Sequence, residues 1–118
     1  MQNLNYYTLL IFAPVLILTG ILGFVLPETV LSGAPAYNVF HIIFGVIGLL
    51  SVLSKREVLI RGFNISFGLI DLYQAAASFM NWYPESHFRW RTGDDVLHIV
   101  IGAALILIGV FSGKKFEN

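Results

Sequence analysis

The chain has 118 residues, of which 57% are hydrophobic and 12% are charged, and its mean hydropathy is +0.78. Soluble domains carry roughly 25% charged residues, so this composition excludes an ordinary water-soluble protein and predicts an integral membrane protein. Seven basic and seven acidic residues cancel, which excludes a nucleic-acid partner recruited by net charge. The sequence has no cysteine, which excludes disulfides, thiolate nucleophiles and cysteine-ligated metal sites.

Apolar segments recur four times along the chain and predict an all-α membrane protein. A spanning helix needs about 20 apolar residues, a length that the first and third segments reach and that the fourth only approaches. The four helices are predicted over about residues 6–26, 39–53, 55–80 and 96–111. Because the connections are short, the predicted fold is an up-down bundle of four transmembrane helices in a single domain, residues 1–118.

The connecting segments carry the expected boundary signals. Ser54 and Glu57 have the spacing of a capping box and predict the start of the third helix. Asn38 and Asp95 precede apolar runs and are predicted to cap the second and fourth helices. The segment 81–94 is rich in aromatic residues of the kind found at headgroup depth, so it is predicted to lie on the membrane surface: Trp82, Tyr83, Phe88 and Trp90.

Basic residues are unevenly distributed between the two predicted sides of the membrane. Lys55, Arg56, Arg61, Lys114 and Lys115 share a side with the N-terminus, whereas Arg89 and Arg91 lie opposite. The positive-inside rule therefore predicts that both termini are cytoplasmic.

An eight-residue pattern occurs twice, in the second and the fourth predicted helix. Residues 38–45 read Asn-Val-Phe-His-Ile-Ile-Phe-Gly, and residues 95–102 read Asp-Val-Leu-His-Ile-Val-Ile-Gly. Two helices separate the copies, so both run in the same direction, and the pattern predicts two helical-hairpin repeats. His41 and His98 then lie at one depth, and the small residues that follow each histidine predict that both face the bundle interior.

The third predicted helix has its own polar stripe. Asn64 and Asp71 recur at helical spacing, and Gln74 lies nearly one turn further along. A carboxylate near mid-span costs on the order of 3 kcal/mol, so Asp71 is either a protonated structural residue or part of a proton or ion path. By its position in the chain, Asp71 is predicted to lie about two turns below the histidines, with Gln74 the closer neighbour of an imidazole.

These residues resemble a known family. Gly20-Ile-Leu-Gly23-Phe-Val, Asn38-x-x-His41 with Gly45, and Asp95-x-x-His98 with Gly102 are similar to a bacterial domain-of-unknown-function family of small four-helix membrane proteins with paired NxxHxxxG motifs. The resemblance covers almost the whole chain and implies the same four-span fold and paired histidines, but no established activity. Asp95 replaces the second Asn of the pattern, and Asp71 stands where a small residue is expected.

Three interpretations of His41 and His98 stay open. In the first, the histidines are structural and bond free backbone groups near the capped helix starts. In the second, they ligate a haem b between two helices, with Gly45 and Gly102 leaving room for the porphyrin. In the third, they form a metal or proton site with Gln74 or Asp71, which lacks a convincing third ligand, so no metal residue is assigned.

The sequence contains no catalytic motif, such as a phosphate loop or a nucleophile elbow, so no catalytic residue and no enzyme are predicted. The expected function is a small non-enzymatic scaffold or accessory subunit in the lipid bilayer, as a homo-oligomer or in a larger membrane complex, with no cofactor. Two alternatives are a haem b electron carrier that uses His41 and His98, and an oligomeric solute or proton transporter that uses Asp71.

Overall fold

The computed structural model describes residues 4–28 and 31–112, and these residues form helices and turns without a β-strand. The all-helical prediction is therefore confirmed for this part of the chain. Lys114 and Lys115, which support the predicted orientation, lie outside it. The helices are α1 (Leu4–Val25), α2 (Pro35–Ser54), α3 (Glu57–Met80), the short α4 (Glu85–Phe88) and α5 (Thr92–Phe111).

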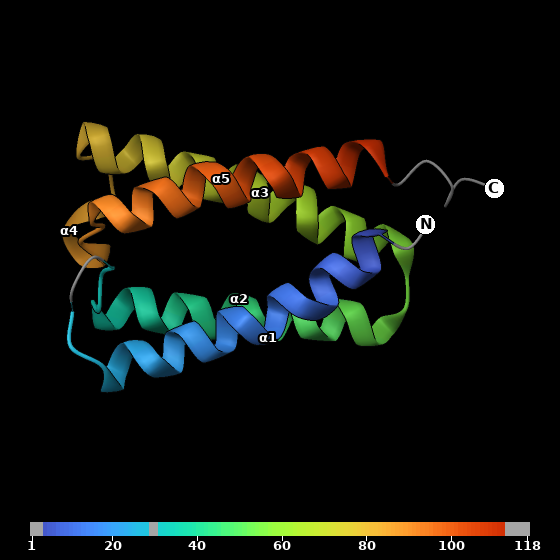
Figure 1. Cartoon of the computed structure of the whole chain (residues 1–118), viewed down its shortest axis with the longest axis horizontal. Helices are drawn as coiled ribbons and strands as arrows, with labels where there is room; N and C mark the ends of the chain where they lie inside the picture. Colours follow the sequence, from blue (N-terminus) through green and yellow to red (C-terminus); the bar gives the residue numbers. More distant parts are fainter. Residues whose placement is uncertain (1–3, 29–30, 113–118) are drawn as a thin grey trace.

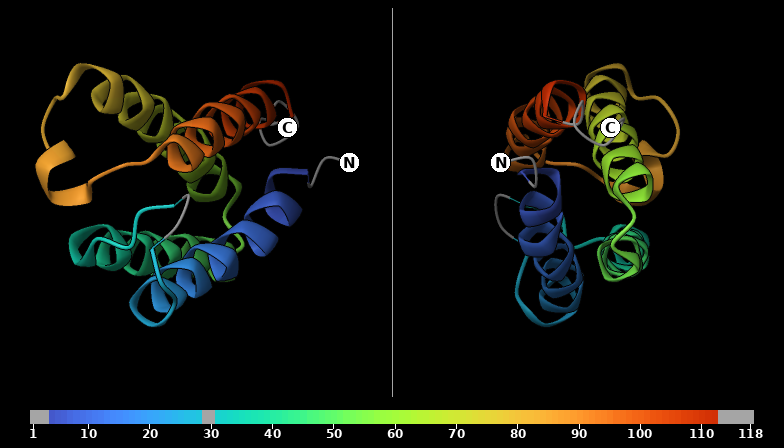
Figure 2. Two further views of the ribbon diagram at one scale, coloured as in Figure 1. Left: turned by 60° about the vertical axis from the view of Figure 1, so that its left-hand side comes forward. Right: turned by 90° about the vertical axis from the view of Figure 1, so that its right-hand side faces the viewer.

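The four long helices form two layers, each an antiparallel pair (Figure 1). α1 packs along α2, and α3 packs along α5, whereas contacts between the two pairs are sparser. We call the end of the bundle that holds Leu4, Ser112 and the α2–α3 turn the inner end, and the opposite end, with α4, the outer end. α1 lies near the other layer at its N-terminal end and diverges from it toward the outer end (Figures 1 and 2).

Glycines set the close packing within each pair. A side-chain carbon added at Gly20 would lie 2.5 Å from the Asn38 carbonyl oxygen, so the backbones of α1 and α2 approach each other closely there. In the other pair, a carbon added at Gly68 would lie 2.8 Å from the Gly102 carbonyl oxygen. Small residues let membrane helices approach closely enough for dispersion contacts, which replace the hydrophobic effect inside lipid. Each pair is therefore a tightly packed unit.

The inner end joins the two pairs through a dry core. Leu9, Ala13, Val52 and Ile60 are almost completely buried and contact one another there. Beside them, the Asn64 side-chain amide on α3 donates to the Asn5 side-chain oxygen at 2.9 Å and to the Asn5 carbonyl at 3.3 Å. This amide pair is the buried polar link between α1 and α3.

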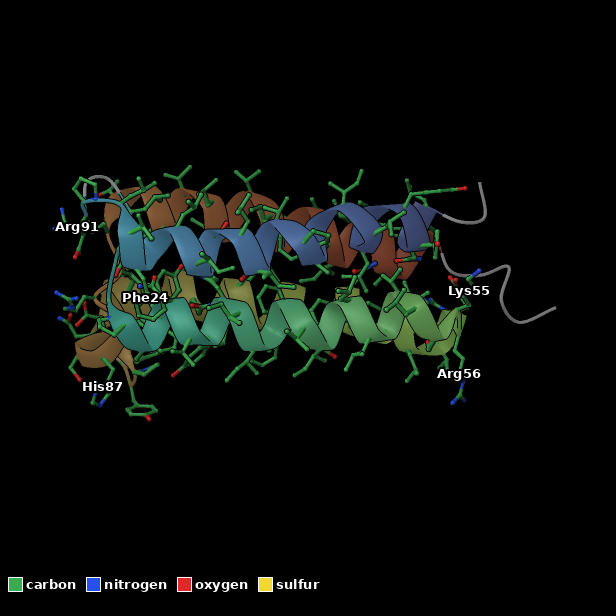
Figure 3. All side chains as sticks on the ribbon, turned by 90° about the horizontal axis from the view of Figure 1, so that it is seen from below. Phe24, Lys55, Arg56, His87 and Arg91 are labelled. Carbon is green, nitrogen blue, oxygen red and sulfur yellow. The ribbon has the colours of Figure 1, made fainter. Side chains whose placement is uncertain are left out.

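The outer surface of the bundle is strongly apolar. Large apolar side chains are exposed on all four long helices, among them Ile11, Leu53, Leu69, Phe79 and Phe111. Charged side chains gather at the two ends instead, with Lys55 and Arg56 at the inner end and Arg91 at the outer end (Figure 3). By length and composition, α1, α2 and α5 are able to cross a membrane. α3 has 24 residues, but its buried polar stripe lowers its hydropathy.

Two helices begin earlier than predicted, which corrects the predicted caps. α2 starts with Pro35, whose fixed φ suits a first helical position, and its N-cap is Ala34. α5 starts at Thr92 after the N-cap Arg91. Asn38 and Asp95 therefore lie inside their helices, and the prediction that they are caps is wrong.

The predicted capping box at residues 54–57 is also wrong. Ser54 is the last residue of α2, and its hydroxyl donates to the Ser51 carbonyl at 2.6 Å. Lys55 adopts a left-handed conformation with φ of 58°, which ends α2. The N-cap of α3 is Arg56, so Glu57 is the first residue of α3 and not the third. A tight turn replaces the expected cap because α2 extends one residue beyond its predicted end.

Candidate functional site

His41 and His98 point into the interior at the outer end of the bundle, where they are only 9% and 6% exposed. Tyr37, one turn before His41 on α2, lies between them. The ring of Tyr37 lies 4.2 Å from the His41 ring, centroid to centroid, and its hydroxyl lies 2.6 Å from Nε2 of His98. The two imidazoles therefore share one phenol as a neighbour and do not face each other directly.

Each histidine has an unused nitrogen. Nδ1 of His41 and Nδ1 of His98 are buried, and neither has a hydrogen-bond partner among the described residues. A buried polar atom without a partner costs about 1–3 kcal/mol relative to a satisfied one, so each such nitrogen calls for an explanation. Both histidines line the same internal space, described below.

Asp71 lies closer to the level of the histidines than the predicted two turns. Its Cβ lies 3.0 Å from the position that a side-chain carbon of Gly102 would occupy, and Gly102 follows His98 by about one helical turn. The Asp71 carboxylate accepts a hydrogen bond from the Gln74 amide at 3.3 Å, and the Gln74 oxygen accepts one from the Trp90 indole at 3.0 Å. Gln74 therefore bonds Asp71 and Trp90, and it joins neither imidazole by a hydrogen bond in the described part of the chain.

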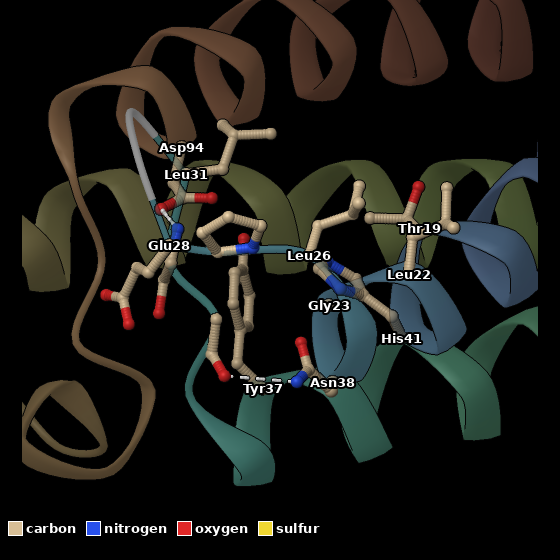
Figure 4. Close-up of a pocket in the computed structure, with 13 residues that line it drawn as sticks. Thr19, Leu22, Gly23, Leu26, Glu28, Leu31, Tyr37, Asn38, His41 and Asp94 are labelled. Carbon is tan, nitrogen blue, oxygen red and sulfur yellow. Dashed lines mark hydrogen bonds between the residues drawn. The ribbon is translucent and has the colours of Figure 1, made fainter.

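A cavity of about 250 Å³ lies among these residues, between the two helix pairs. Polar groups occupy its outer part and aromatic or aliphatic groups its inner part. Its lining includes Thr19, Tyr37, His41, Asp71, Asp94 and His98, together with Phe12, Leu16, Phe67 and Ile101. A second space of about 240 Å³ adjoins it toward the α1–α2 connection, where Thr19, Tyr37 and His41 face Leu26 and Leu31 (Figure 4).

Phenylalanines close this cavity toward the inner end. The Phe67 ring stacks on Phe63 at 5.4 Å and contacts Phe12 at 5.7 Å, Phe44 at 5.4 Å and Phe40 at 6.0 Å, all between ring centroids. Leu16 and Leu105 are buried against the same cluster. The polar space is thus a pocket with an apolar floor, and among the described residues no polar side chain joins it to the Asn5–Asn64 pair.

Loops close the pocket at the outer end. The Asp94 carboxylate accepts hydrogen bonds from the Ser32 amide at 2.7 Å and the Arg91 amide at 2.9 Å, so it ties the α1–α2 connection to the start of α5. Glu28 pairs with Arg91 at 2.9 Å and with Arg89 at 3.8 Å. The hydrogen bond from Arg91 lowers the pKa of Glu28 below its ordinary 4.5, partly offset by desolvation.

The residues do not fit a bis-histidine haem. Tyr37 occupies Nε2 of His98, and its ring lies 4.2 Å from the His41 ring, so the phenol stands where a porphyrin between the two imidazoles would have to lie. Gly45 and Gly102 do not provide space either. A side-chain carbon at Gly45 would lie 2.5 Å from Ile17, and one at Gly102 would lie 2.9 Å from the Gly68 carbonyl, so each gap is filled by the neighbouring helix.

No cluster of three or more potential metal ligands occurs within residues 4–28 and 31–112. Sequence reasoning placed His41, His98, Asp71 and Asn64 in the interior, and the structure buries all four. It missed Tyr37 and Asp94, and it assigned Trp90 to the membrane surface, although Trp90 is buried against Tyr37 and Ala77. The spacing of Tyr37 from His41, one helical turn, was the available signal.

Searches against protein-family models, curated proteins and solved structures give no match. The function has to be inferred from the geometry of the pocket.

Proposed function

We propose that this chain crosses a membrane four times, with α1, α2, α3 and α5. α3 supplies the fourth span because 24 residues make a helix of about 36 Å, longer than the roughly 30 Å hydrocarbon core. Its polar residues Asn64, Asp71 and Gln74 are buried inside the bundle, so they do not meet lipid. Apolar side chains exposed on α3, such as Leu69 and Phe79, support the same placement.

Within this frame, the chain is a non-enzymatic accessory protein that binds a small ligand in the outer pocket. The observation that carries this proposal is the pair of unpartnered Nδ1 atoms on His41 and His98, both buried beside one cavity. If these histidines were purely structural, the fold would be expected to pair both nitrogens of each ring, because buried polar atoms without a partner are uncommon in native proteins. A bound ligand would complete the hydrogen bonds that the protein leaves open.

The same geometry favours binding over conduction. The Phe12, Phe44, Phe63 and Phe67 rings separate the pocket from the inner end, so Asp71 has no visible polar route across the bundle. The glycine seams of both helix pairs also leave little freedom for the helices to slide. Asp71 acts in this proposal as one wall of a binding site.

Native mass spectrometry of protein extracted from membranes in mild detergent tests the binding proposal. We expect a small-molecule adduct on the wild type that is lost in His41→Leu and retained in Val46→Leu, which changes an outward-facing residue of α2 away from the pocket. Equal adduct occupancy in His41→Leu would contradict a ligand held by the histidines.

Cysteine labelling tests the four-span topology, because the sequence has no cysteine and each introduced thiol is unique. Lys55→Cys and Ser86→Cys place exposed thiols at the inner and outer ends. In a bacterial inner membrane with cytoplasmic termini, an impermeant maleimide added to intact cells that have a permeabilised outer membrane should label Ser86→Cys only. Labelling of both positions from one side would contradict a fourth span.

A further inference from the structure

The pocket continues into an apolar groove that opens toward the membrane. The groove has a volume of about 360 Å³ and runs between α1 and α5, two long helices of different layers that make few contacts with each other. It shares Phe12, Val15 and Ile101 with the pocket, so the two spaces adjoin. Its remaining lining is almost entirely aliphatic: Thr8, Ile11, Val100, Ala104, Leu105 and Ile108.

A polar pocket joined to a lipid-facing apolar groove matches a molecule with a compact polar head and an apolar tail. The groove residues Ile11 and Val100 are largely exposed on the bundle surface, where lipid would surround them. Such a molecule could enter sideways from the bilayer between α1 and α5 without crossing the loops at the outer end. His41 and His98 line the pocket where its head would stop.

The acidic residues of the pocket indicate what kind of polar head group the ligand has. Asp71 and Asp94 line the pocket, and its described lining contains no lysine or arginine. An anionic head, such as a fatty-acid carboxylate or a phosphate, would meet carboxyl groups without a compensating cation. A neutral head with hydrogen-bonding oxygens suits the two imidazoles, and the Tyr37, Phe12 and Phe67 rings offer aromatic walls to a planar head.

We propose that the pocket and the groove together bind a lipid-soluble benzoquinone or its quinol, with the ring in the pocket beside His41 and His98 and the tail between α1 and α5. This inference rests on the proposed ligand-binding function and names its ligand class. A quinone oxygen accepts a hydrogen bond from a protonated imidazole nitrogen, and a quinol hydroxyl donates one to an unprotonated imidazole nitrogen, so quinone and quinol suit the two tautomers of an imidazole. The pocket volume suits one substituted ring.

Tryptophan quenching tests the proposal, because quinones quench indole fluorescence at short range. The chain has two tryptophans, and Trp82→Phe removes the exposed one. Trp90 is then the remaining source of tryptophan fluorescence. It is buried, and its ring centroid lies 6.4 Å from that of His98. In nanodiscs of this variant, decylubiquinone should quench Trp90 saturably as its mole fraction rises. Quenching that rises linearly without saturation would overturn the proposal.

Matched variants separate specific binding from partition into the bilayer. Val15→Phe adds bulk where the pocket joins the groove and should weaken decylubiquinone binding about tenfold or more. Val46→Phe adds the same bulk to α2 at a residue of similar exposure, 43% against 48% for Val15, and should leave binding unchanged. Equal quenching curves for the two variants would overturn the proposed entry.

Competition identifies the part of the ligand that is recognised, and it needs only the Trp82→Phe background. Decanol and decanoate carry a ten-carbon tail without the ring, and each should displace decylubiquinone at least tenfold less well than a short-tailed non-quenching quinol. Equal displacement by decanol would overturn recognition of the ring. If native mass spectrometry then showed a different adduct that depends on His41, the ligand-binding function would stand and only the quinone would be rejected.

Discussion

The two ends of the bundle place their buried polar groups in different surroundings. At the inner end, the Asn64 amide donates to Asn5 inside a core of Leu9, Val52 and Ile60, although Asn5 Nδ2 and Asn64 Oδ1 have no partner of their own among the described residues. At the outer end, His41 and His98 keep an unpartnered nitrogen each beside a cavity. We interpret the inner end as a structural contact between the two layers. In the proposed function, the outer end is a pocket whose hydrogen bonds are completed by a bound ligand.

This difference follows from the path of α1. Near its start, α1 contacts α3 closely enough for an amide pair, and toward its end it diverges from the other layer, which leaves room for the pocket (Figure 2). The glycine seams hold α1 against α2 and α3 against α5, and the pocket lies in the space between these two layers. We therefore expect substitutions at the inner end to change stability more than substitutions in the pocket.

The largest expected effect is on the inner core. Leu9→Ala should lower the free energy of unfolding by about 2–5 kcal/mol, because Leu9 is completely buried and its neighbours cannot close the space. Leu31→Ala, which trims a half-exposed wall of the outer pocket, should cost less than about 1 kcal/mol. Detergent-induced unfolding followed by circular dichroism measures both. Equal losses would contradict the contrast between the ends.

The amide pair should show a measurable coupling. A double-mutant cycle of Asn5→Ala and Asn64→Ala should give an interaction energy of about 1 kcal/mol, the usual scale for hydrogen bonds between membrane helices. The cycle requires the free energy of unfolding of four proteins: the wild type, the two single variants and the double variant. Additive losses would show that the pair is not the link between the layers.

Filling the pocket should have a smaller effect of opposite sign. Thr19→Ile adds apolar volume to a residue that lines both parts of the cavity, and it should raise the free energy of unfolding by about 0.5–1 kcal/mol while reducing occupancy by the ligand. Thermal unfolding and native mass spectrometry measure the two effects. A loss of stability greater than about 1 kcal/mol would indicate a pocket that is already tightly packed.

The smallest effect concerns the loops at the outer end. Because the pKa of Glu28 is below 4.5 in the folded protein, its ion pair with Arg91 stabilises the fold above that pH, and this contribution is lost as the pH falls through the lowered value. Glu28→Gln should therefore lower the free energy of unfolding slightly at pH 7. On acidification below pH 4.5, the variant should lose less of its free energy of unfolding than the wild type does. If the free energies of unfolding of the wild type and the variant changed in parallel with pH, a stabilising ion pair between Glu28 and Arg91 would be contradicted.

The sequence predicted the helices well, because long apolar segments and polar connections leave few alternatives. It also predicted that His41, His98, Asn64 and Asp71 are buried, since small residues follow them at helical spacing. The helix starts were missed because Pro35 and Thr92 begin α2 and α5 in segments that look polar. The pocket itself lies where α1 diverges from the other layer, a tertiary feature that no local pattern records.

The most direct test of the contrast between the ends compares two substitutions of a buried polar residue by leucine. Asn64→Leu breaks a made hydrogen bond and should lower the free energy of unfolding by about 1 kcal/mol. His41→Leu removes a nitrogen that has no partner and should leave the free energy of unfolding unchanged or raise it by up to about 1 kcal/mol, with loss of the bound ligand. A loss of stability in His41→Leu as large as that in Asn64→Leu would contradict the account and show that His41 is a structural residue.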